Sequence, residues 1–494
     1  MTLMSKQPSI ELALHSADRK PIQKGLADYH WQFASFAVAF GIWTSVNLWT
    51  WFHSSSLNVV SAFVAIAWTL PIGTSVIGLY GAWRAYWTLQ PMRRRFGEAV
   101  LPVSERLIVV IPTIGRLDTL PALRRVVESA RESLRPHFPR LSIDLVVEDM
   151  CPAQAQINAL ASGTPELRIL TVPVSFETYH GTRFKARANC FADLQRTLRG
   201  EACPDVWVLH MDDDTGLAPD TASEVARFIH DQNARGSEAL DLAQGILCYP
   251  RELAPNRLIW LADAVRPGCD ISLFSALTGS GSPRAGLHGE MLLIRASVEA
   301  EIGWDYGPRT LVEDADFALR FCARHPGRSG WIPARSYGAS PATVSDFVRQ
   351  RARWVWGLLA LVADHERPGV PGVDRRRRAL MLHNTIVWAC SPLCHPGFVL
   401  LLCTVTGTFE TAPLSAVLIP LWTTNIAFWI WLYWEGLKLN ALSSAHARRV
   451  WWEPVLLVLL MPVYSTWEVV GVLHGVWSFL FAPEPRFNVI AKPV

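Results

Sequence analysis

The stretch Val206-Trp-Val-Leu-His-Met-Asp-Asp-Asp-Thr215 decides the fold class, because an apolar run ends there in three consecutive carboxylates. A buried strand with this ending brings hard oxygen ligands to the edge of a sheet, where a divalent cation and a phosphate group can meet. The alternative is a polar turn whose side chains cap the helix indicated after Pro219. The stretch by itself is compatible with both interpretations.

Short apolar strands alternate with helices throughout residues 101–345, which is the pattern of βαβ units in a mostly parallel sheet. The strands are expected at 107–111, 143–147, 206–209, 242–249 and 291–294, and helices at 120–134 and 222–229. Ligands of such sheets bind beyond the carboxyl ends of the strands. We therefore expect Thr113, Asp149 and the aspartates at 212–214 to meet in one crevice.

The composition indicates a membrane protein, since half of the 494 residues are hydrophobic and 22 are Trp. No Asp, Glu, Lys or Arg occurs in 29–83, in 379–409 or in 411–434, and each run is long enough to cross a bilayer. We predict two transmembrane helices in 29–83 and transmembrane or re-entrant helices in 380–482. The net charge of +3 does not indicate a nucleic-acid partner.

Basic residues flank the first membrane block on both sides, so the positive-inside rule predicts that residues 1–28 and the region after the block are cytosolic. Three spans after the catalytic region would leave the tail, 483–494, on the opposite side. One segment is therefore expected to be interfacial or re-entrant. The candidates are 381–409, which contains Pro392 and Pro396, and 454–482, which contains Pro462 and Glu468 and for which we favour a shallow hairpin. Glu468 is expected either to line an acceptor path or to pair with a buried Arg or His.

Two further motifs carry reactive side chains. Glu313-Asp314 stands at an expected helix start, where an anionic carboxylate is stabilised and can act as a general base; simple helix capping is the alternative. Gln350, Arg353 and Trp354 share one face of a helix expected over 343–363. A guanidinium and an indole on one face suit a diphosphate and a sugar, although an interfacial basic helix produces the same pattern.

In this order the motifs resemble the membrane-embedded family 2 glycosyltransferases of the cellulose synthase-like superfamily. The likeness to the Egghead-type β-1,4-mannosyltransferases covers roughly residues 105–360. It rests on five stretches, which are Phe184-Lys-Ala-Arg-Ala188, His210 to Thr215, Gln244 to Tyr249, Ala262-Asp263 with Arg266, and Asp346 to Trp354. Asp213 and Asp214 depart from that group, where we expect Glu. The resemblance implies a GT-A-type, Rossmann-like catalytic domain, cytosolic and inserted between transmembrane segments.

The resemblance also implies roles for individual residues. Asp314 would be the catalytic base, and Asp212 and Asp214 would hold Mg²⁺ or Mn²⁺. The donor nucleotide and its diphosphate would be bound by Thr113, Glu148, Asp149, Lys185, Arg187, Gln350 and Arg353. The acceptor would be bound by Glu313, Trp354 and His288.

These roles lead to a predicted function and its alternatives. We expect an inverting β-glycosyltransferase, integral to the membrane, that moves a sugar from a nucleotide-diphosphate donor, with GDP-mannose as the candidate, to a lipid-linked sugar acceptor at the cytosolic face. The main alternative is a processive synthase that also translocates its polysaccharide. Transfer to a polyprenyl phosphate is disfavoured by Gln350 and Trp354, and a transporter or receptor with a degenerate domain is disfavoured by the complete carboxylate set. The oligomeric state is left open.

Overall fold

The computed structural model describes residues 71–94, 100–218, 220–363, 378–379, 387–393, 418–444 and 452–481. The predicted tails at 1–28 and 483–494, the first helix predicted within 29–83 and most of 380–417 lie outside the described residues. The second helix of that first block corresponds to α5 (Ile72–Arg94), which continues beyond the predicted end at residue 83.

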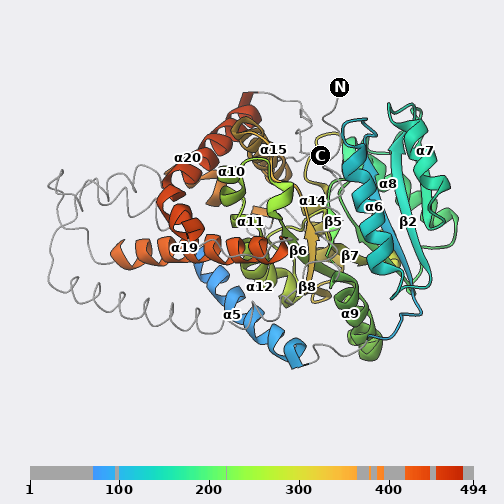
Figure 1. Ribbon diagram of the computed structural model, residues 1–494, viewed down its shortest axis with the longest axis horizontal. Coiled ribbons are helices and arrows are strands. Elements are labelled where there is room, and N and C mark those ends of the chain that lie inside the picture. Colours follow the sequence, from blue (N-terminus) through green and yellow to red (C-terminus); the bar gives the residue numbers. More distant parts are fainter. Residues whose placement is uncertain are drawn as a thin grey trace, which may run out of the picture.

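An eight-stranded sheet forms the centre of the α/β part of the chain, on the right of Figure 1. Its order is β3-β2-β1-β4-β7-β6-β8-β5. The strands are β1 (Arg106–Thr113), β2 (Leu141–Glu148), β3 (Leu167–Val172), β4 (Val206–His210), β5 (Gly216–Leu217), β6 (Leu242–Cys248), β7 (Leu292–Arg295) and β8 (Ser329–Tyr337). The strands expected from the sequence are therefore present.

The sheet is mixed, which corrects part of the expectation of a mostly parallel sheet. β1 pairs in parallel with β2 and β4, β2 with β3, and β6 with β8. β7 runs antiparallel between β4 and β6, and β5 is antiparallel to β8. Because β7 is reversed, its beginning lies at the sheet edge where β1 and β4 end. The residues just before β7 therefore join the strand-end crevice.

Helices cover both faces of the sheet because alternate side chains of each strand point to opposite faces. On β1, Val109 and Ile111 pack into one core with α6 and α9, whereas Ile108 and Val110 pack into another with α8. The helices of this part are α6 (Leu120–Leu134), α7 (Gln154–Ser162), α8 (Phe184–Leu198), α9 (Thr221–Arg235), α13 (Ala296–Ile302) and α14 (Glu313–Arg324).

A second apolar core lies between the sheet and a group of helices on the left and in the centre of Figure 1. In this core Gly436 lies so close to the carbonyl oxygen of Ala264 that a Cβ atom at position 436 would collide with that oxygen. The helices are α5, α10 (Arg257–Ala262), α11 (Val265–Cys269), α12 (Ser275–Leu277), α15 (Val344–Ala363), α19 (Leu418–Ser443) and α20 (Trp452–Phe481). Shorter turns are η1 (Gly236–Glu238), η2 (Arg251–Leu253), the π turn η3 (Asp270–Phe274), η4 (Thr278–Ser280) and η5 (Ser391–Leu393).

The last apolar segment is one continuous helix, so the hairpin favoured from its sequence is wrong. α20 runs from Trp452 to Phe481 with Pro462 inside it. A proline removes one backbone donor without necessarily ending a helix, and the freed carbonyl groups can find other partners. The carbonyl that loses its helical donor is that of Val458, four residues before Pro462, whereas the carbonyl oxygen of Pro462 accepts the hydroxyl of Thr466 at 2.8 Å. Among the described residues, α20 alone is long and apolar enough to cross a membrane.

Candidate active site

One large cavity, of about 1090 Å³, opens at the carboxyl edge of β1 and β4 and extends towards α19 and α20. Polar groups line the part next to the sheet, and they include Thr113, Glu148, Lys185, Arg187, Asp212, Asp213, Asp214, Arg266, Glu290, Glu313, Asp314, Gln350, Arg353 and Trp354. Apolar side chains line the part next to the long helices, and they include Ile426, Trp429, Ile430, Val458, Met461 and Val469. The cavity therefore joins a charged site to an apolar one.

The strand ends bring Thr113 and the three aspartates together, as the sequence predicted. The hydroxyl of Thr113, at the end of β1, donates to Asp213 Oδ2 at 2.6 Å. The same hydroxyl oxygen accepts the backbone N–H of Gly115 at 3.2 Å. Asp212 forms an ion pair with Lys185 at the start of α8. The helix-capping alternative does not hold, because the N-cap of α9 is Asp220 rather than one of these aspartates.

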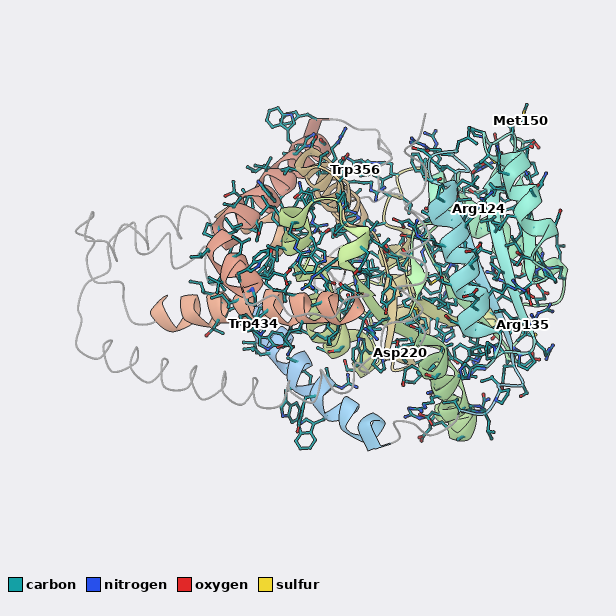
Figure 2. All side chains as sticks on the ribbon, in the orientation of Figure 1. Arg124, Arg135, Met150, Asp220, Trp356 and Trp434 are labelled. Atoms are coloured by element: carbon teal, nitrogen blue, oxygen red, sulfur yellow. The ribbon has the colours of Figure 1, made fainter. Side chains whose placement is uncertain are left out.

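At the end of β2 the cavity is lined by Glu148, whereas Asp149 is exposed and does not line it. Asp149 leads into Met150, which is 84% exposed, has a positive φ of 62° and projects from the edge of the molecule (Figure 2). Glu148 forms an ion pair of 2.5 Å with Arg187. Of the two residues predicted to bind the donor here, Glu148 lines the cavity and Asp149 does not.

Lys185 and Arg187 enter the cavity from the first turn of α8. Lys185 pairs with Asp212 and lies 3.4 Å from Glu313. Burial lowers the pKa of Lys185, but Asp212 and Glu313 outweigh it and hold the pKa well above its usual value. Gly289 permits this position, because a Cβ there would collide with the Lys185 ammonium. Lys185 is thus a fixed positive charge among carboxylates.

Asp314 lies in the first turn of α14 and faces the same cavity. Burial, together with the negative charges of Glu313 and Glu290 and against the opposing charge of Lys185, raises the pKa of its carboxyl to about 7. One carboxylate oxygen accepts the backbone N–H of Ala315 at 2.8 Å, which fixes the side chain. A carboxyl with a pKa near neutrality is suited to take up a proton at physiological pH.

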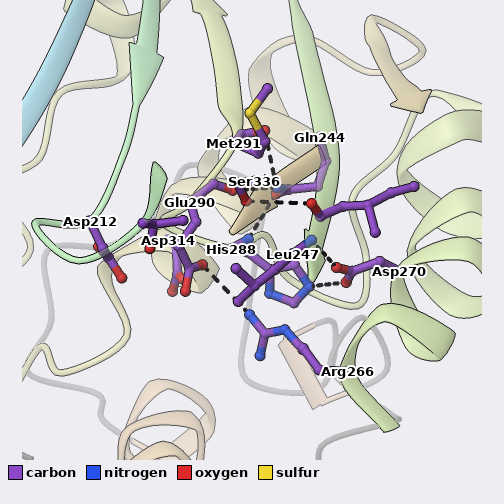
Figure 3. A network of polar contacts seen from close by, with 12 residues as sticks. Asp212, Gln244, Leu247, Arg266, Asp270, His288, Glu290, Met291, Asp314 and Ser336 are labelled. Carbon is purple, nitrogen blue, oxygen red and sulfur yellow. Dashed lines mark hydrogen bonds and ion pairs between the residues drawn. The ribbon is translucent and has the colours of Figure 1, made fainter. Parts of the chain in front are cut away.

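Figure 3 shows a polar network beside these carboxylates, with Asp212, Glu290 and Asp314 on one side of it. Glu290 lies 3.6 Å from the guanidinium of Arg266. His288 faces Asp270 through its Nε2 at 2.7 Å, while its backbone N–H donates to the side chain of Gln244 at 2.8 Å. His288 thus lines the cavity, but that ring nitrogen is directed to Asp270 rather than into open space.

Gln350, Arg353 and Trp354 all line the cavity from α15, so the predicted shared helix face is present. Burial lowers the pKa of Arg353, and the negative charges of Glu313, Asp212 and Asp314 oppose that effect. The indole of Trp354 lies under the guanidinium of Arg266, at 5.2 Å from the ring centre. The face therefore presents one cation and one aromatic plane to the carboxylates.

Comparison with known proteins identifies a family for this part of the chain. Residues 207–435 match the family model described as "Glycosyl transferase family group 2". The chain contains a family 2 glycosyltransferase domain. The resemblance predicted from the motifs is thereby confirmed.

Curated relatives of the family 2 domain are named as mannosyltransferases. "Beta-1,4-mannosyltransferase bre-3" of Caenorhabditis briggsae is 27% identical over 233 residues, which are 46% of this chain and 48% of the relative. "Beta-1,4-mannosyltransferase egh" of Drosophila melanogaster is 27% identical over 232 residues, 46% of this chain and 47% of its own. The match thus spans about half the length of these relatives.

Among solved structures, the S. aureus TarS 1–349 crystal structure covers 78% of this chain and 94% of its own chain at 12% identity. The TM-score of that comparison is 0.31, too low to indicate a common fold.

No role in the site was predicted from the sequence for Glu290 or for Arg351. Glu290 was not predicted as a site residue because it precedes an antiparallel strand, whereas the strand-end rule applies to residues that follow a parallel strand. Arg351 lies between the named positions of the Gln350-to-Trp354 motif, yet it pairs with Asp263 and with Glu468, each at 2.8 Å. Glu468 thus has the buried arginine partner that was one of its two expected roles, and it also lines the cavity.

Proposed function

We propose that this protein is an inverting β-glycosyltransferase that moves one sugar from a nucleotide-diphosphate donor to a lipid-linked sugar acceptor at the cytosolic face of a membrane. One observation carries the proposal, namely the single cavity that joins the carboxylates and cations at the strand ends to an apolar section between α19 and α20. Mannose from GDP-mannose is the candidate donor sugar, because the curated relatives are named β-1,4-mannosyltransferases.

The donor binds at the strand-end side of the cavity. The nucleotide lies against Thr113 and Glu148, and its diphosphate lies among Lys185, Arg187 and Arg353. Arginine offers paired donors to phosphate oxygens, and lysine offers a compact charge. The existing ion pairs of Lys185 and Arg187 with carboxylates support this assignment, since a diphosphate can replace a carboxylate as the anionic partner.

The aspartates fit a divalent cation that is shared with the substrate. No group of three or more His, Cys, Asp or Glu side chains suited to a metal occurs in the described part of the chain. A cation held by Asp212 and Asp214 alone therefore needs donor oxygens, which is how Mg²⁺ is usually bound, through one or two carboxylates plus substrate phosphates. When bound, Mg²⁺ or Mn²⁺ neutralises charge that develops on the diphosphate.

The reaction is a single displacement at the anomeric carbon. Asp314 accepts the proton of an acceptor hydroxyl, whose oxygen forms a new bond to the anomeric carbon from the side opposite the diphosphate. The bond between that carbon and the diphosphate oxygen breaks, and its electron pair leaves with the diphosphate. Arg353 and Lys185 stabilise the negative charge that develops there. One displacement inverts the anomeric centre, so an α-linked donor yields a β-linked product.

The acceptor lies between Asp314 and the apolar section of the cavity. Trp354 offers a flat surface to a sugar ring, with Glu313 and His288 beside it. The lipid part of the acceptor extends between α19 and α20, where the cavity is lined by aliphatic and aromatic side chains. Membrane lipids therefore contact the same region, and the α/β domain lies on the cytosolic side.

The deciding experiment supplies the purified full chain with a panel of radiolabelled nucleotide sugars, Mg²⁺ or Mn²⁺, and glycolipid acceptors. We expect transfer of a single β-linked sugar, with mannose from GDP-mannose as the preferred donor. Product length separates this function from a processive synthase, because a ladder of long chains would overturn single addition. The configuration of the new linkage, read by NMR, tests inversion separately.

A further inference from the structure

The first turn of α20 is fixed to the α/β domain. Glu453, which is 2% exposed, forms ion pairs with Arg251 and with Arg257, both located shortly after β6. The guanidinium of Arg257 also lies 5.9 Å from the ring centre of Trp452. The beginning of this helix is therefore held at the surface of the domain that contains the strand-end site.

The second half of α20 is fixed to the same domain through α15. Glu468 pairs with Arg351 at 2.8 Å, and the ring centre of Trp467 lies 6.2 Å from that of Phe347. Gly475 allows close approach, since a Cβ there would press against the backbone of α15. At the end of the helix, Phe479 packs in one cluster with Trp356 of α15 and Phe184 at the start of α8.

These contacts are difficult to combine with a helix that crosses a bilayer. At about 1.5 Å per residue, Glu453 and Phe479 are roughly 39 Å apart along the helix axis, more than the roughly 30 Å hydrocarbon core. A spanning orientation would place these two residues on opposite sides of the membrane. Both residues, however, contact the same α/β domain. Arg251 and Arg257 lie at one of these contacts, and Arg309, which faces the ring of Trp356, lies at the other. Arginine side chains are costly to place inside a bilayer.

The opposite face of α20 is largely apolar and exposed, although Ser465, Thr466 and His474 are exposed as well. Its exposed large apolar side chains form two groups, which are Trp452, Val455, Val458, Leu459 and Val463 in the first half and Val470, Leu473, Trp477, Leu480 and Phe481 in the second. The two charged residues of α20, Glu453 and Glu468, both point to the α/β domain. Exposed Trp at both ends of such a stripe is typical of a helix at a membrane surface.

We propose that α20 lies in the plane of the membrane surface, with this apolar face in the lipid and the opposite face on the α/β domain. Both ends of α20 then stay on the side of the membrane where the strand-end site lies. Val458, Met461 and Val469 of the same helix line the cavity, so the lipid surface borders the apolar end of the site. This proposal concerns the position of the helix and holds for any substrate.

Depth measurements on the full-length protein in vesicles test the proposal. The fluorophore NBD is attached to cysteines introduced by Leu459→Cys, Leu473→Cys and Leu480→Cys, and the equally treated parent chain gives the background. Phosphatidylcholine carrying a nitroxide near its headgroup or deep in its acyl chain quenches the fluorophore according to depth. Leu198→Cys on α8, where the leucine is 71% exposed, is the control in water.

We expect all three α20 positions to be quenched more by the shallow nitroxide, at equal depth, and the control to be quenched by neither. A change along the helix from stronger quenching by the shallow nitroxide to stronger quenching by the deep nitroxide would overturn the proposal, because a spanning helix has such a depth profile. Absence of lipid quenching at all three positions would overturn it too, since protein would then cover the face. Enzymatic activity does not enter this test, so its outcome is separate from that of the proposed function.

Discussion

The raised pKa of Asp314 predicts how the transferase activity depends on pH. A carboxyl with its ordinary pKa near 3.8 is fully ionised above pH 6, and the activity would be flat there. With a pKa of about 7, the fraction of Asp314 able to accept a proton is about one tenth at pH 6, about half at pH 7 and about nine tenths at pH 8. The rate should therefore rise close to tenfold between pH 6 and pH 8.

Substitution separates this effect from other titrations. Asp314→Asn should reduce kcat by about 10²- to 10⁴-fold, the usual contribution of general base catalysis, and should remove the acidic limb. The same substitution should raise the thermal midpoint more at pH 8 than at pH 5. Between pH 3.8 and about 7, Asp314 is protonated in the folded state but ionised in the unfolded state. At higher pH the folded state must hold a buried negative charge, which opposes folding.

The assay is the initial rate of sugar transfer by the purified full chain, from pH 5.5 to 8.5 at saturating donor. Asp316→Asn is the matched control, since Asp316 lies on the same helix turn but pairs with Arg320 at 3.0 Å instead of lining the cavity. Its profile should keep the acidic limb. A flat wild-type profile between pH 6 and pH 8, or full activity of Asp314→Asn, would refute the assignment of Asp314 as the base.

Three other predictions concern the charges of the site. Glu290→Gln should lower the pKa of Asp314 and move the acidic limb of the rate profile to lower pH, because one neighbouring negative charge is removed; an unmoved limb would contradict this. EDTA should abolish transfer and Mg²⁺ or Mn²⁺ should restore it, with Asp212→Asn requiring more metal for half-maximal rate; EDTA-resistant transfer would exclude a metal requirement. Arg351→Met should destabilise the fold by about 3–5 kcal/mol in denaturant unfolding, since it leaves two carboxylates without their buried cation, whereas Arg349→Met, which removes a side chain that is 47% exposed, should cost at most about 1 kcal/mol.

Local patterns in the sequence were sufficient for five of the eight strands, for several helices and for one edge of the site. The helix expected at 120–134 has those bounds, and the apolar run before the aspartates is β4. The meeting of Thr113 with Asp213 could be predicted from a general property of parallel strands, whose carboxyl ends lie at the same edge. The face shared by Gln350, Arg353 and Trp354 could be predicted from helical spacing alone.

The direction of β7 and the course of α20 were decided only by tertiary packing. A four-residue strand carries no information on whether it runs parallel or antiparallel, so Glu290 could not be assigned to the cavity from sequence. Pro462 and Glu468 suggested a break in the last helix, but α15 supplies Arg351 as the partner that makes Glu468 tolerable there.

The sequence by itself determined the strands, the helices and the residue types gathered at the strand ends, because these depend on periodicity and on near neighbours. Tertiary structure alone decided which charges face each other, and through them the raised pKa of Asp314. That pKa depends on burial, on the adjacent Glu313, on Lys185 and on Glu290, a residue 24 positions away in the chain. A hydrophobic pattern depends on the spacing of residues along the chain, whereas the interaction between two charged groups depends on their separation in space.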